Sequence, residues 1–459
     1  MKKISFVLIM LVTMFYSFNV NAKDTVVSMN KYKEEKFNQI LNTYDLNDSI
    51  DGLLTGGYIL KEEFELEDNK YNDYQAIVVK YDKKNKIVWD YTYGKTKEDY
   101  LDYLNYSYNS EGKIDGYLLS VIATGDVNEN SNNETVFIKI DLEGKEILQK
   151  PLSLNQGIRI NKIITTYNEG LVEGYIAIGN NGTNSYLIKL DKDLNVVWSR
   201  EVSKENNLTI NYADLVPVMS ENKLVGYSII KEVTDPNNQK TSQLIKYNNW
   251  GEEPVIIADL NKYDSYYLEA ANEGFILYGA TSEVKLSKGE SSYYLINYNS
   301  SNESVWETIG ESPLDKDKKV RLLPNKEDNL IKEYLLLYSN DVDKSSEVVK
   351  IKTDGEIKDK IKKIYDEYYT IEDFIMTDNI LYLVGQINCP KDDTCEYDSN
   401  SLFLISEEEK VIEVKDNDSR NVLIIMGLFI LLILGTVIYR KKRVIKAKKD
   451  VKKKKKKVR

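Results

Sequence analysis

The chain has 459 residues, of which 42% are hydrophobic and 29% charged, and a formal net charge of −11. It contains no histidine, which excludes Ser-His-Asp triads, Cys-His dyads and histidine-dependent zinc enzymes. Tyrosine is abundant, with 35 residues against 10 Phe and 4 Trp. Since tyrosine suits half-buried strands, the composition favours β-sheet.

The first 22 residues have the layout of a secretory signal peptide. Lys2 and Lys3 precede an apolar run from Ile4 to Phe15, and small residues up to Ala22 suit cleavage. An uncleaved N-terminal anchor helix is the alternative. We therefore expect residues 1–22 to be a signal peptide and residues 23–414 to form an exported folded domain.

A pattern of short β-type runs returns about every fifty residues through that domain. Each copy has four parts: an inner strand, a glycine–aromatic strand, a strand ending near Lys-x-Asp, and a short outer strand. The glycine–aromatic marker recurs at Gly57-Tyr58, Gly116-Tyr117, Gly174-Tyr175, Gly226-Tyr227 and Gly274-Phe275, with weaker copies at Glu333-Tyr334 and Leu381-Tyr382. The predicted fold class is therefore all-β, a seven-bladed β-propeller, although the weak last copies leave six or eight blades open.

The outer strand of several copies ends in tryptophan. After Asp82 a polar stretch predicts a chain reversal, and Trp89 then ends the outer strand. Trp198 and Trp306 occupy the matching place in their copies. We expect each tryptophan to fill the gap against the next blade.

The unit from Lys189-Leu190-Asp191 to Val197-Trp198 resembles the repeats of PQQ-like (quinoprotein-like) β-propellers, and is similar to repeat propellers of bacterial cell-surface chains. The resemblance covers about residues 35–415. That family includes cofactor-dependent dehydrogenases and non-catalytic scaffolds of envelope assembly. This sequence lacks the vicinal cysteine pair of the dehydrogenase site, and it reads Lys192-Asp193-Leu194-Asn195 where the family has a Thr-Gly turn. The resemblance thus implies a scaffold without cofactor.

Tyrosine and arginine residues near the starts of the inner strands are the candidate ligand-binding residues. In a propeller these strands line the central channel, and phenol and guanidinium groups at its mouth suit stacking on sugars or gripping a peptide. The alternative is that the tyrosines plug the channel or pack between blades. The candidates are Tyr103, Arg159, Tyr212, Tyr267, Arg321 and Tyr369.

The two cysteines, Cys389 and Cys395, lie close together in a polar stretch. A local disulfide suits an exported protein, and two free thiols are the alternative. Two thiols without histidine make a poor metal site, so no metal is expected.

The C-terminal part predicts a membrane anchor. After a short stalk at 415–421, residues 422–439 are uncharged and long enough for one transmembrane helix. The tail, 440–459, carries fourteen Lys and Arg against one Asp, which places it in the cytoplasm and the bulk of the chain outside. The tail suits anionic lipid headgroups, whereas the acidic remainder of the chain disfavours nucleic acid.

These features predict a single-pass, type I cell-surface protein whose propeller is non-catalytic and binds or scaffolds an extracellular protein or glycan. An extracellular polysaccharide hydrolase or lyase is the alternative, because paired carboxylates such as Asp99 and Asp102 serve glycoside chemistry elsewhere. A sensor acting through a membrane partner is a third interpretation.

Overall fold

The structure is a computed structural model. It describes residues 25–27, 32, 34–66, 69–94, 97–109, 111–124, 133–154, 157–168, 171–202, 208–221, 223–282, 290–315, 320–327, 330–340, 345–364, 369–377, 380–387 and 401–407. Within these ranges the regular elements are all β-strands, β1 to β28.

The strands form seven antiparallel sheets of four, which are the blades of a β-propeller. Blade 1 contains β2 (Glu34–Tyr44), β3 (Ile50–Leu66), β4 (Asn69–Asp82) and β5 (Ile87–Tyr93). Blade 2 contains β6 (Tyr100–Tyr108), β7 (Ile114–Ala123), β8 (Glu134–Asp141) and β9 (Glu146–Pro151). Blade 3 contains β10 (Arg159–Asn168), β11 (Leu171–Asn180), β12 (Ser185–Asp191) and β13 (Val196–Val202). Blade 4 contains β14 (Thr209–Ser220), β15 (Lys223–Thr234), β16 (Lys240–Tyr247) and β17 (Val255–Asp259). Blade 5 contains β18 (Tyr267–Ala270), β19 (Phe275–Thr281), β20 (Glu290–Tyr298) and β21 (Ser304–Asp315). Blade 6 contains β22 (Val320–Glu327), β23 (Leu330–Asn340), β24 (Ser345–Lys352) and β25 (Ile357–Ile364). Blade 7 contains β26 (Tyr369–Thr377), β27 (Ile380–Ile387), β28 (Ser401–Glu407) and β1 (Thr25–Val27).

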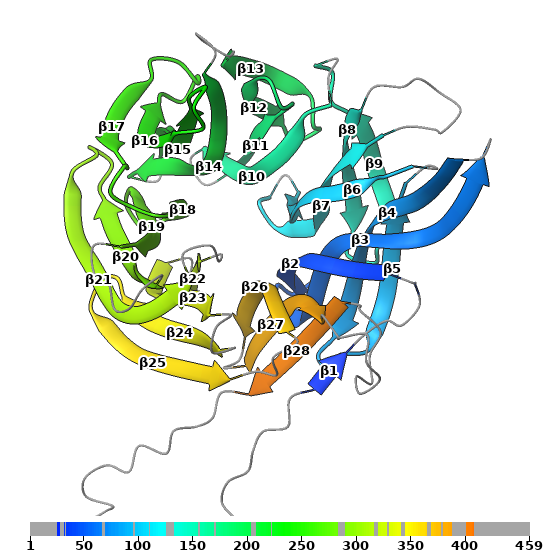
Figure 1. Ribbon diagram of the computed structural model, residues 1–459. Helices are drawn as coiled ribbons and strands as arrows, with labels where there is room; N and C mark the ends of the chain where they lie inside the picture. The colour runs from blue at the N-terminus through cyan, green and yellow to red at the C-terminus, as the bar shows by residue number, and fades with distance from the viewer. Residues whose placement is uncertain are drawn as a thin grey trace, which may run out of the picture. The chain divides into compact units, whose positions relative to one another are not determined.

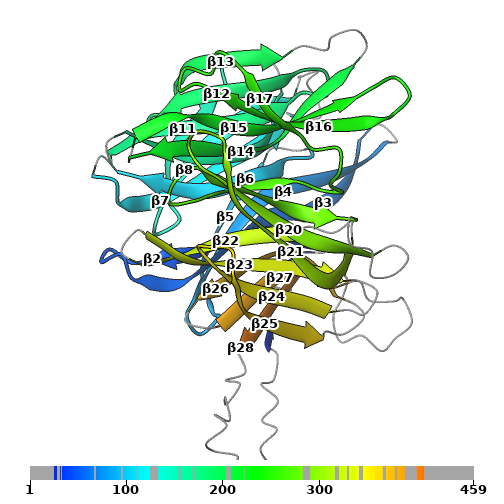
Figure 2. The same cartoon turned by 90° about the vertical axis from the view of Figure 1, so that its left-hand side faces the viewer.

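Seven hydrophobic clusters join the blades into a ring, since each cluster contains side chains from two neighbouring blades. Figure 1 looks down the ring, and Figure 2 shows it from the side with the outer strands β21 and β25 in front. The core therefore lies between the sheets, which explains why strands such as β12 are apolar on both faces. Each cluster can be represented by one residue from each of its two blades: Leu54 and Leu119, Leu118 and Ile160, Ile176 and Leu215, Val216 and Leu277, Ile276 and Leu336, Leu337 and Phe374, and Val384 and Ile40.

The ring closes through the start of the described chain. β1 pairs antiparallel with β28 and supplies the outer strand of blade 7, opposite Phe403, Leu404 and Ile405. The other blades take their four strands from one continuous stretch. Closure thus joins residues nearly 380 positions apart in the sequence, so that blade 7 is completed only when both parts are folded (Thr25 opposite Ile405).

The turn between the third and outer strands has the same design in blade after blade. Asp82 Oδ1 accepts the backbone N–H groups of Lys84 and Lys86, at 2.8 and 2.9 Å, and Asn85 has a φ of 61°. This is a type I turn followed by a left-handed residue that forms a bulge. Equivalent capping residues are Asp141, Asp191, Asn248 and Asn299. We call the face that carries these turns the turn face, and the opposite face, where the inner strands begin, the loop face.

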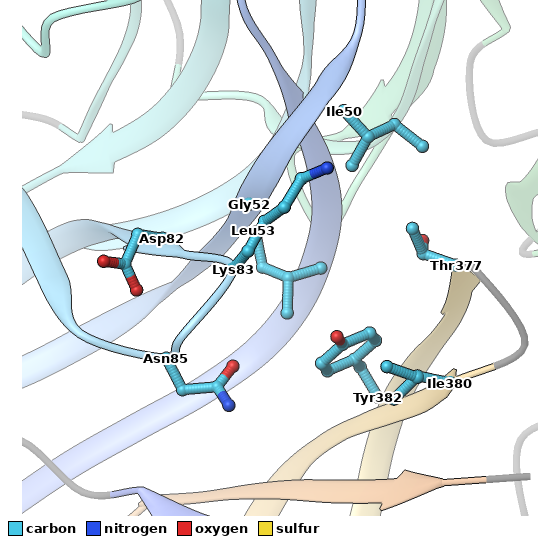
Figure 3. Close-up of a pocket in the computed structure, with 9 residues that line it drawn as sticks. All are labelled: Ile50, Gly52, Leu53, Asp82, Lys83, Asn85, Thr377, Ile380 and Tyr382. Carbon is cyan, nitrogen blue, oxygen red and sulfur yellow. The ribbon is translucent and has the colours of Figure 1, made fainter.

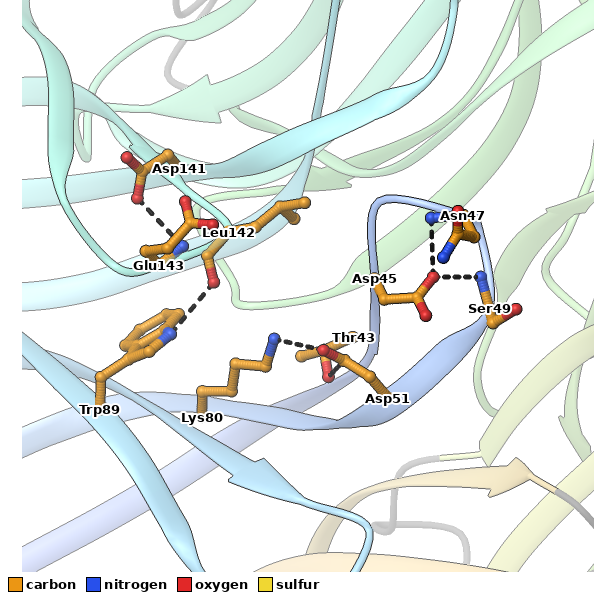
Figure 4. A network of polar contacts seen from close by, with 10 residues as sticks. All are labelled: Thr43, Asp45, Asn47, Ser49, Asp51, Lys80, Trp89, Asp141, Leu142 and Glu143. Atoms are coloured by element: carbon orange, nitrogen blue, oxygen red, sulfur yellow. Dashed lines mark hydrogen bonds and ion pairs between the residues drawn. The ribbon is translucent and has the colours of Figure 1, made fainter.

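Figure 4 shows the polar contacts of blade 1 at the turn face. Asp51 accepts the hydroxyl of Thr43 and pairs with the ammonium of Lys80 at 2.8 Å, so a lysine of the Lys-x-Asp motif is buried but neutralised. The Asp45 turn between β2 and β3 in the same view is capped like the others. The repeated lysine is therefore a structural residue.

Each predicted tryptophan contact with the next blade is confirmed. The Trp89 indole donates to the carbonyl of Leu142 at 3.1 Å, and a Cβ atom on Gly144 would lie 2.6 Å from its ring. Trp198 lies in the same way on Gly251 of blade 4, and Trp306 on Gly355 of blade 6. These glycines have positive φ, and they are needed because the ring leaves no room for a side chain.

One marker of the repeat was wrong. Gly116 pairs with Asp141 and Gly174 with Asp191, but in blade 1 the partner of Asp82 is Gly52, not Gly57. The second strand of blade 1 has 17 residues, so a glycine–tyrosine pair falls by chance five positions later. The remaining markers keep the predicted register.

Several predictions fall outside the described residues: the signal peptide at 1–22, Cys389 and Cys395, the stalk at 415–421, the span at 422–439 and the basic tail at 440–459. Among the residues that are described, there is no helix with the length and apolarity of a membrane span.

Candidate ligand-binding site

Three half-buried tyrosines gather at the loop-face end of blades 1 and 2, and we call them the tyrosine cluster. The ring of Tyr58 lies 5.7 Å from that of Tyr74 and 4.8 Å from that of Tyr100, nearly perpendicular to both. Tyr74 and Tyr100 are 5.7 Å apart with an interplanar angle of 30°. Edge-to-face and tilted packing of this kind holds rings in a defined geometry.

The strand register explains why these rings meet. Tyr58 on β3 lies opposite Ala76 on β4, and Tyr74 is two residues before Ala76, so both side chains point to the same face of blade 1. That face packs against blade 2, because Ala76 belongs to the cluster between the two blades. Tyr100 begins the inner strand of blade 2 at the same level.

Two cations border the tyrosine cluster. The ammonium of Lys36 lies 5.7 Å from the Tyr58 ring centroid, and the Arg159 guanidinium lies 5.8 Å from that of Tyr100. Glu34 pairs with Lys36 at 3.0 Å and accepts the Tyr74 hydroxyl at 3.2 Å. The Arg159 side chain is 58% exposed. Flat rings, two donors and one carboxylate therefore lie together at the rim of the channel, because Lys36 and Arg159 belong to inner strands.

The phenols of Tyr74 and Tyr100 stay protonated. Burial raises the pKa of Tyr74, and the nearby carboxylate of Glu34 adds to the effect. Burial also raises the pKa of Tyr100, assisted by Glu98. Both hydroxyls remain hydrogen-bond donors over the physiological range.

Asp102 lies just inside this rim, and the pKa of its carboxyl group is unusually high. Its side chain is 6% exposed, and burial raises its pKa to about 7, although the Ile160 N–H and Arg159 act in the opposite direction. The N–H of Ile160 donates to Oδ2 at 3.0 Å, and Arg159 is 4.0 Å from Oδ1. At neutral pH Asp102 is only partly ionised, so it neutralises Arg159 incompletely.

Deeper in the channel the charged groups are paired with one another. Lys162 of blade 3 contacts Asp214 of blade 4 at 2.6 Å and donates to the carbonyl of Leu268 at 3.0 Å. Arg321 of blade 6 pairs with Asp373 of blade 7. Burial acts to lower the pKa of Lys162, but Asp214, Tyr103 and Glu269 together outweigh it and the pKa is raised. Both cations are therefore held by carboxylates.

The same carboxylates connect neighbouring blades through backbone N–H groups. Asp214 accepts from Leu268 at 2.7 Å and Asp373 from Ile40 at 3.0 Å. Together with Asp102, these side chains bridge three blade-to-blade junctions along the channel. Their hydrogen bonds serve the ring, which leaves them poorly placed as a pair of catalytic acids.

Tyr212 does not lie at the channel mouth, and this prediction was wrong. Its side chain is 1% exposed, it belongs to the cluster between blades 3 and 4, and its hydroxyl lies 2.6 Å from that of Tyr247. The alternation of strand side chains turns the Tyr212 ring into the contact between the two sheets, whereas Asn211 before it faces polar neighbours.

The other predicted residues lie in different parts of the inner strands. Tyr103 is partly buried beside the charges of Lys162 and Arg321, and burial raises its pKa. Tyr267 packs on Tyr278 with ring centroids 5.5 Å apart, and burial raises its pKa to about 12. Tyr369 is the first residue of β26. Among the predicted residues whose side chains the structure describes, Arg159 is the one that contacts the tyrosine cluster.

The cluster itself was largely missed. Tyr58 and Tyr74 lie on the second and third strands, whereas the predicted residues all belong to inner strands. β3 and β4 have 17 and 14 residues, but the extra length does not place these tyrosines, because Tyr58 pairs with Lys36 and Tyr74 with Leu60, inside the part of the blade that the inner strand covers. In the described part of the chain, no group of three Cys, Asp or Glu residues has metal-site geometry.

No protein-family model matches the chain, and no curated protein matches its sequence. Among solved structures, it is similar to the Dos1 propeller, with 10% identity, a TM-score of 0.46, and coverage of 84% of this chain and 94% of that one. It is also similar to the WD40 domain of Neurospora crassa Pan2 (11%, TM-score 0.45, 84% and 96%) and to the β-propeller domain of the Trilobed protease from Pyrococcus furiosus (14%, TM-score 0.42, 80% and 95%). The class of the protein, a β-propeller, rests on its own sheet topology.

Proposed function

We propose that this protein is a non-catalytic binding or scaffold propeller that engages a protein or glycan at the loop-face mouth of its channel. The tyrosine cluster is the observation that supports this proposal. Its rings are half-buried and held by mutual contacts, so they present aromatic surface without the entropy cost of ordering flexible side chains. Lys36, Glu34 and Arg159 add donors and an acceptor at the edge of that surface.

The state of the channel charges supports binding over catalysis. Lys162 and Arg321 are each paired with a carboxylate, and those carboxylates also accept backbone N–H groups. A hydrolase or lyase needs an acid and a base free to move a proton. Asp102, with a pKa of about 7, is the residue that a polysaccharide-cleaving activity would use, and this is the second candidate.

The location is part of the same proposal. The signal-like residues 1–22, the apolar segment 422–439 and the basic tail support a type I bacterial cell-surface protein with the propeller outside. The tail would contact anionic lipid headgroups, and no cofactor is needed. The acidic remainder of the chain supports partners other than nucleic acid.

The test is a binding screen of the full chain in detergent against immobilised neutral and acidic glycans and against solubilised membrane proteins. A variant with Tyr58→Ala and Tyr100→Ala removes two rings of the cluster. We expect it to lose the captured partner by at least about tenfold, because each stacked ring contributes roughly 0.5–1.5 kcal/mol beyond its buried area.

The matched control changes Tyr108 and Tyr167 to alanine, which removes two packed rings at the turn face. It should bind the partner as the wild type does, provided that circular dichroism shows both variants folded. Equal loss in both variants would overturn the proposal. Release of sugar products by the wild type, abolished by Asp102→Asn, would favour the enzyme instead.

A further inference from the structure

The outer strand of blade 4, β17, is an open sheet edge that carries almost no charge. It pairs with β16 on one side, and no strand of the described chain pairs with its other side. Figure 1 places it at the outside of the ring. Its sequence is Val-Ile-Ile-Ala-Asp, so its one charge is on Asp259, the last residue. The unpaired backbone N–H and C=O groups of such an edge can pair with another chain.

The outer strands of the other blades from 1 to 6 are protected in the way that sheet edges usually are. Charged side chains on an edge strand, lysine above all, prevent a further strand from pairing. Each of these outer strands has such a residue before its last position. The residues are Asp90 in β5, Lys150 in β9, Arg200 in β13, Glu307 in β21 and Lys358 in β25. β17 therefore lacks a protection that its counterparts have.

The apolar side chains of β17 are exposed on both faces of its sheet. Val255 and Ile256 are each 58% exposed. They are consecutive residues in a regularly paired part of the strand, opposite Lys246 and Ile245, so their side chains point to opposite faces. A partner lying on one face would cover only one of them. A strand added along the edge would bring its own side chains against both.

The turn that precedes β17 adds an exposed tryptophan. The Trp250 side chain is 61% exposed, whereas the other three tryptophans pack on the next blade. Asn248 Oδ1 accepts the Trp250 N–H at 3.0 Å, and Arg200 of β13 donates to the Trp250 carbonyl at 3.1 Å. A backbone held in this way presents the indole ring to solvent beside the start of the edge. The same turn position is polar in the other blades: Lys84, Glu143, Asp193, Ser301 and Asp354.

Carboxylates stand at both ends of the uncharged part of β17. Glu253 comes shortly before Val255, Asp259 ends the strand, and both are exposed. Glu252 is exposed too, but it is paired with Arg200 at 2.9 Å. Basic residues in an added strand, spaced as Glu253 and Asp259 are, would match these two charges in either strand direction.

From these observations we propose that β17 binds an extended segment of a partner polypeptide, which pairs with it as a fifth strand of blade 4. The segment carries apolar residues between two basic ones. A second copy of this chain fits less well, because Glu253 and Asp259 of one copy would face the same carboxylates of the other. The edge is separate from the tyrosine cluster and from a pocket of about 180 Å³ between blades 7 and 1 (Figure 3).

The first experiment immobilises the full chain in detergent and titrates it with blocked peptides Lys-a-b-Thr-a-b-Lys, in which a and b are each Val, Ile, Leu or Tyr. The best of them should bind with a dissociation constant on the order of 1 mM or lower. The control is the same peptide N-methylated at its five central residues, which keeps the side chains and charges but removes the backbone donors. It should bind at least about tenfold more weakly. No binding in the whole series, or equal binding of the methylated peptide, would overturn the proposal.

The second experiment locates the peptide. Ile256→Lys puts a charge on the edge, as Lys358 does in β25, and should weaken binding by at least about tenfold. The control is Val305→Lys on the outer strand of blade 5, where the side chain is 59% exposed, and it should bind as the wild type does. Circular dichroism checks that both variants are folded. Binding that persists in Ile256→Lys, is lost equally in both, or is lost in Tyr58→Ala/Tyr100→Ala would contradict the assignment.

Light scattering of the full chain in detergent tests the other occupant of the edge. The chain is expected to be a monomer, with the same mass in the wild type and in Ile256→Lys. A wild-type dimer that Ile256→Lys dissociates would show that β17 pairs with a second copy, and the assignment to a basic partner segment would then be wrong.

Discussion

Tyrosines surround the channel at both faces of the first three blades, but they are used differently. At the turn face Tyr44, Tyr106, Tyr108 and Tyr167 form a row with ring centroids 5.8–6.4 Å apart, and the hydroxyl of Tyr106 donates to the carbonyl of Asn42. At the loop face the tyrosine cluster is bordered by Lys36 and by the exposed Arg159. One residue type thus packs blades together at one face and presents aromatic surface at the other.

The turns explain this difference. At the turn face the connections to the outer strands are short, and in blades 1 to 5 an Asp or Asn side chain caps them, so the ends of these strands are held at fixed positions. At the loop face the second and third strands vary in length between blades, and β3 and β4 are the longest. Repeated turns hold the ring, whereas variable strand ends can carry a binding surface.

The largest expected effect is on the turn face. Gly144→Ala should lower the free energy of unfolding by about 2–4 kcal/mol, because a side chain at positive φ is strained and its Cβ meets the Trp89 ring. The control is Gly182→Ala at the loop face, which has a similar φ but no atom within 4 Å. It should cost about 1 kcal/mol in the same denaturant titration. Equal losses of stability in the two variants would mean that the clash with the Trp89 ring does not contribute to the free energy of unfolding.

The next effect concerns Asp102 at the loop face and depends on pH. Its pKa is raised from 3.8 to about 7 in the folded protein, so the folded state binds the extra proton. Its stabilising contribution is present below the unfolded pKa and is lost as the pH rises through about 7. Asp102→Asn should therefore be close to the wild type near pH 4 and more stable by about 1–3 kcal/mol at pH 8.

The measurement for Asp102 is the free energy of unfolding across this pH range. Asp259→Asn, an exposed carboxylate, serves as the control and should follow the wild type. A difference that is constant with pH would show that Asp102 does not titrate differently in the two states.

A smaller effect is expected for a single turn cap. Asp191→Ala removes the acceptor of the N–H groups of Asp193 and Asn195, and should cost about 1 kcal/mol at neutral pH. Burial acts to raise the pKa of Asp191, but the hydrogen bonds from Asn195 and Asp193 and the nearby Lys150 together outweigh burial and lower the pKa. The loss should therefore shrink as the pH falls through the folded pKa. Asp193→Ala, in the same turn, should have little effect on the unfolding curve.

The smallest change in stability is expected for Arg159→Ala. The side chain is 58% exposed, so the free energy of unfolding should move by less than about 0.5 kcal/mol. Binding at the loop-face mouth should nevertheless weaken measurably, because one of the two bordering cations is lost. If the captured partner is held equally well, Arg159 lies outside the contact, and the cluster acts through its rings alone.

Part of the site could be predicted and part could not. Arg159 was found because it begins an inner strand, and inner strands line a propeller channel. Tyr212 fails the same argument, because a register set by its pairing with Lys231 turns its ring between the blades. Tyr58 and Tyr74 lie on the second and third strands, and their pairing opposite Lys36 and Leu60 places them beside the loop-face end of the inner strand, a neighbourhood that an argument from inner-strand residues alone does not reach.

By itself the sequence determined the repeat, the four-strand blade, the capped turns and the tryptophan contacts, because these depend on spacing along a continuous stretch of chain. Only the tertiary structure decided which tyrosines are exposed, which carboxylates are paired, and how β1 closes the ring. Those outcomes depend on contacts between blades, where the neighbour of a residue lies about fifty positions away or, at the closing junction, at the other end of the domain. The local sequence pattern does not identify such neighbours, which is why the least predictable features lie in the first and last blades.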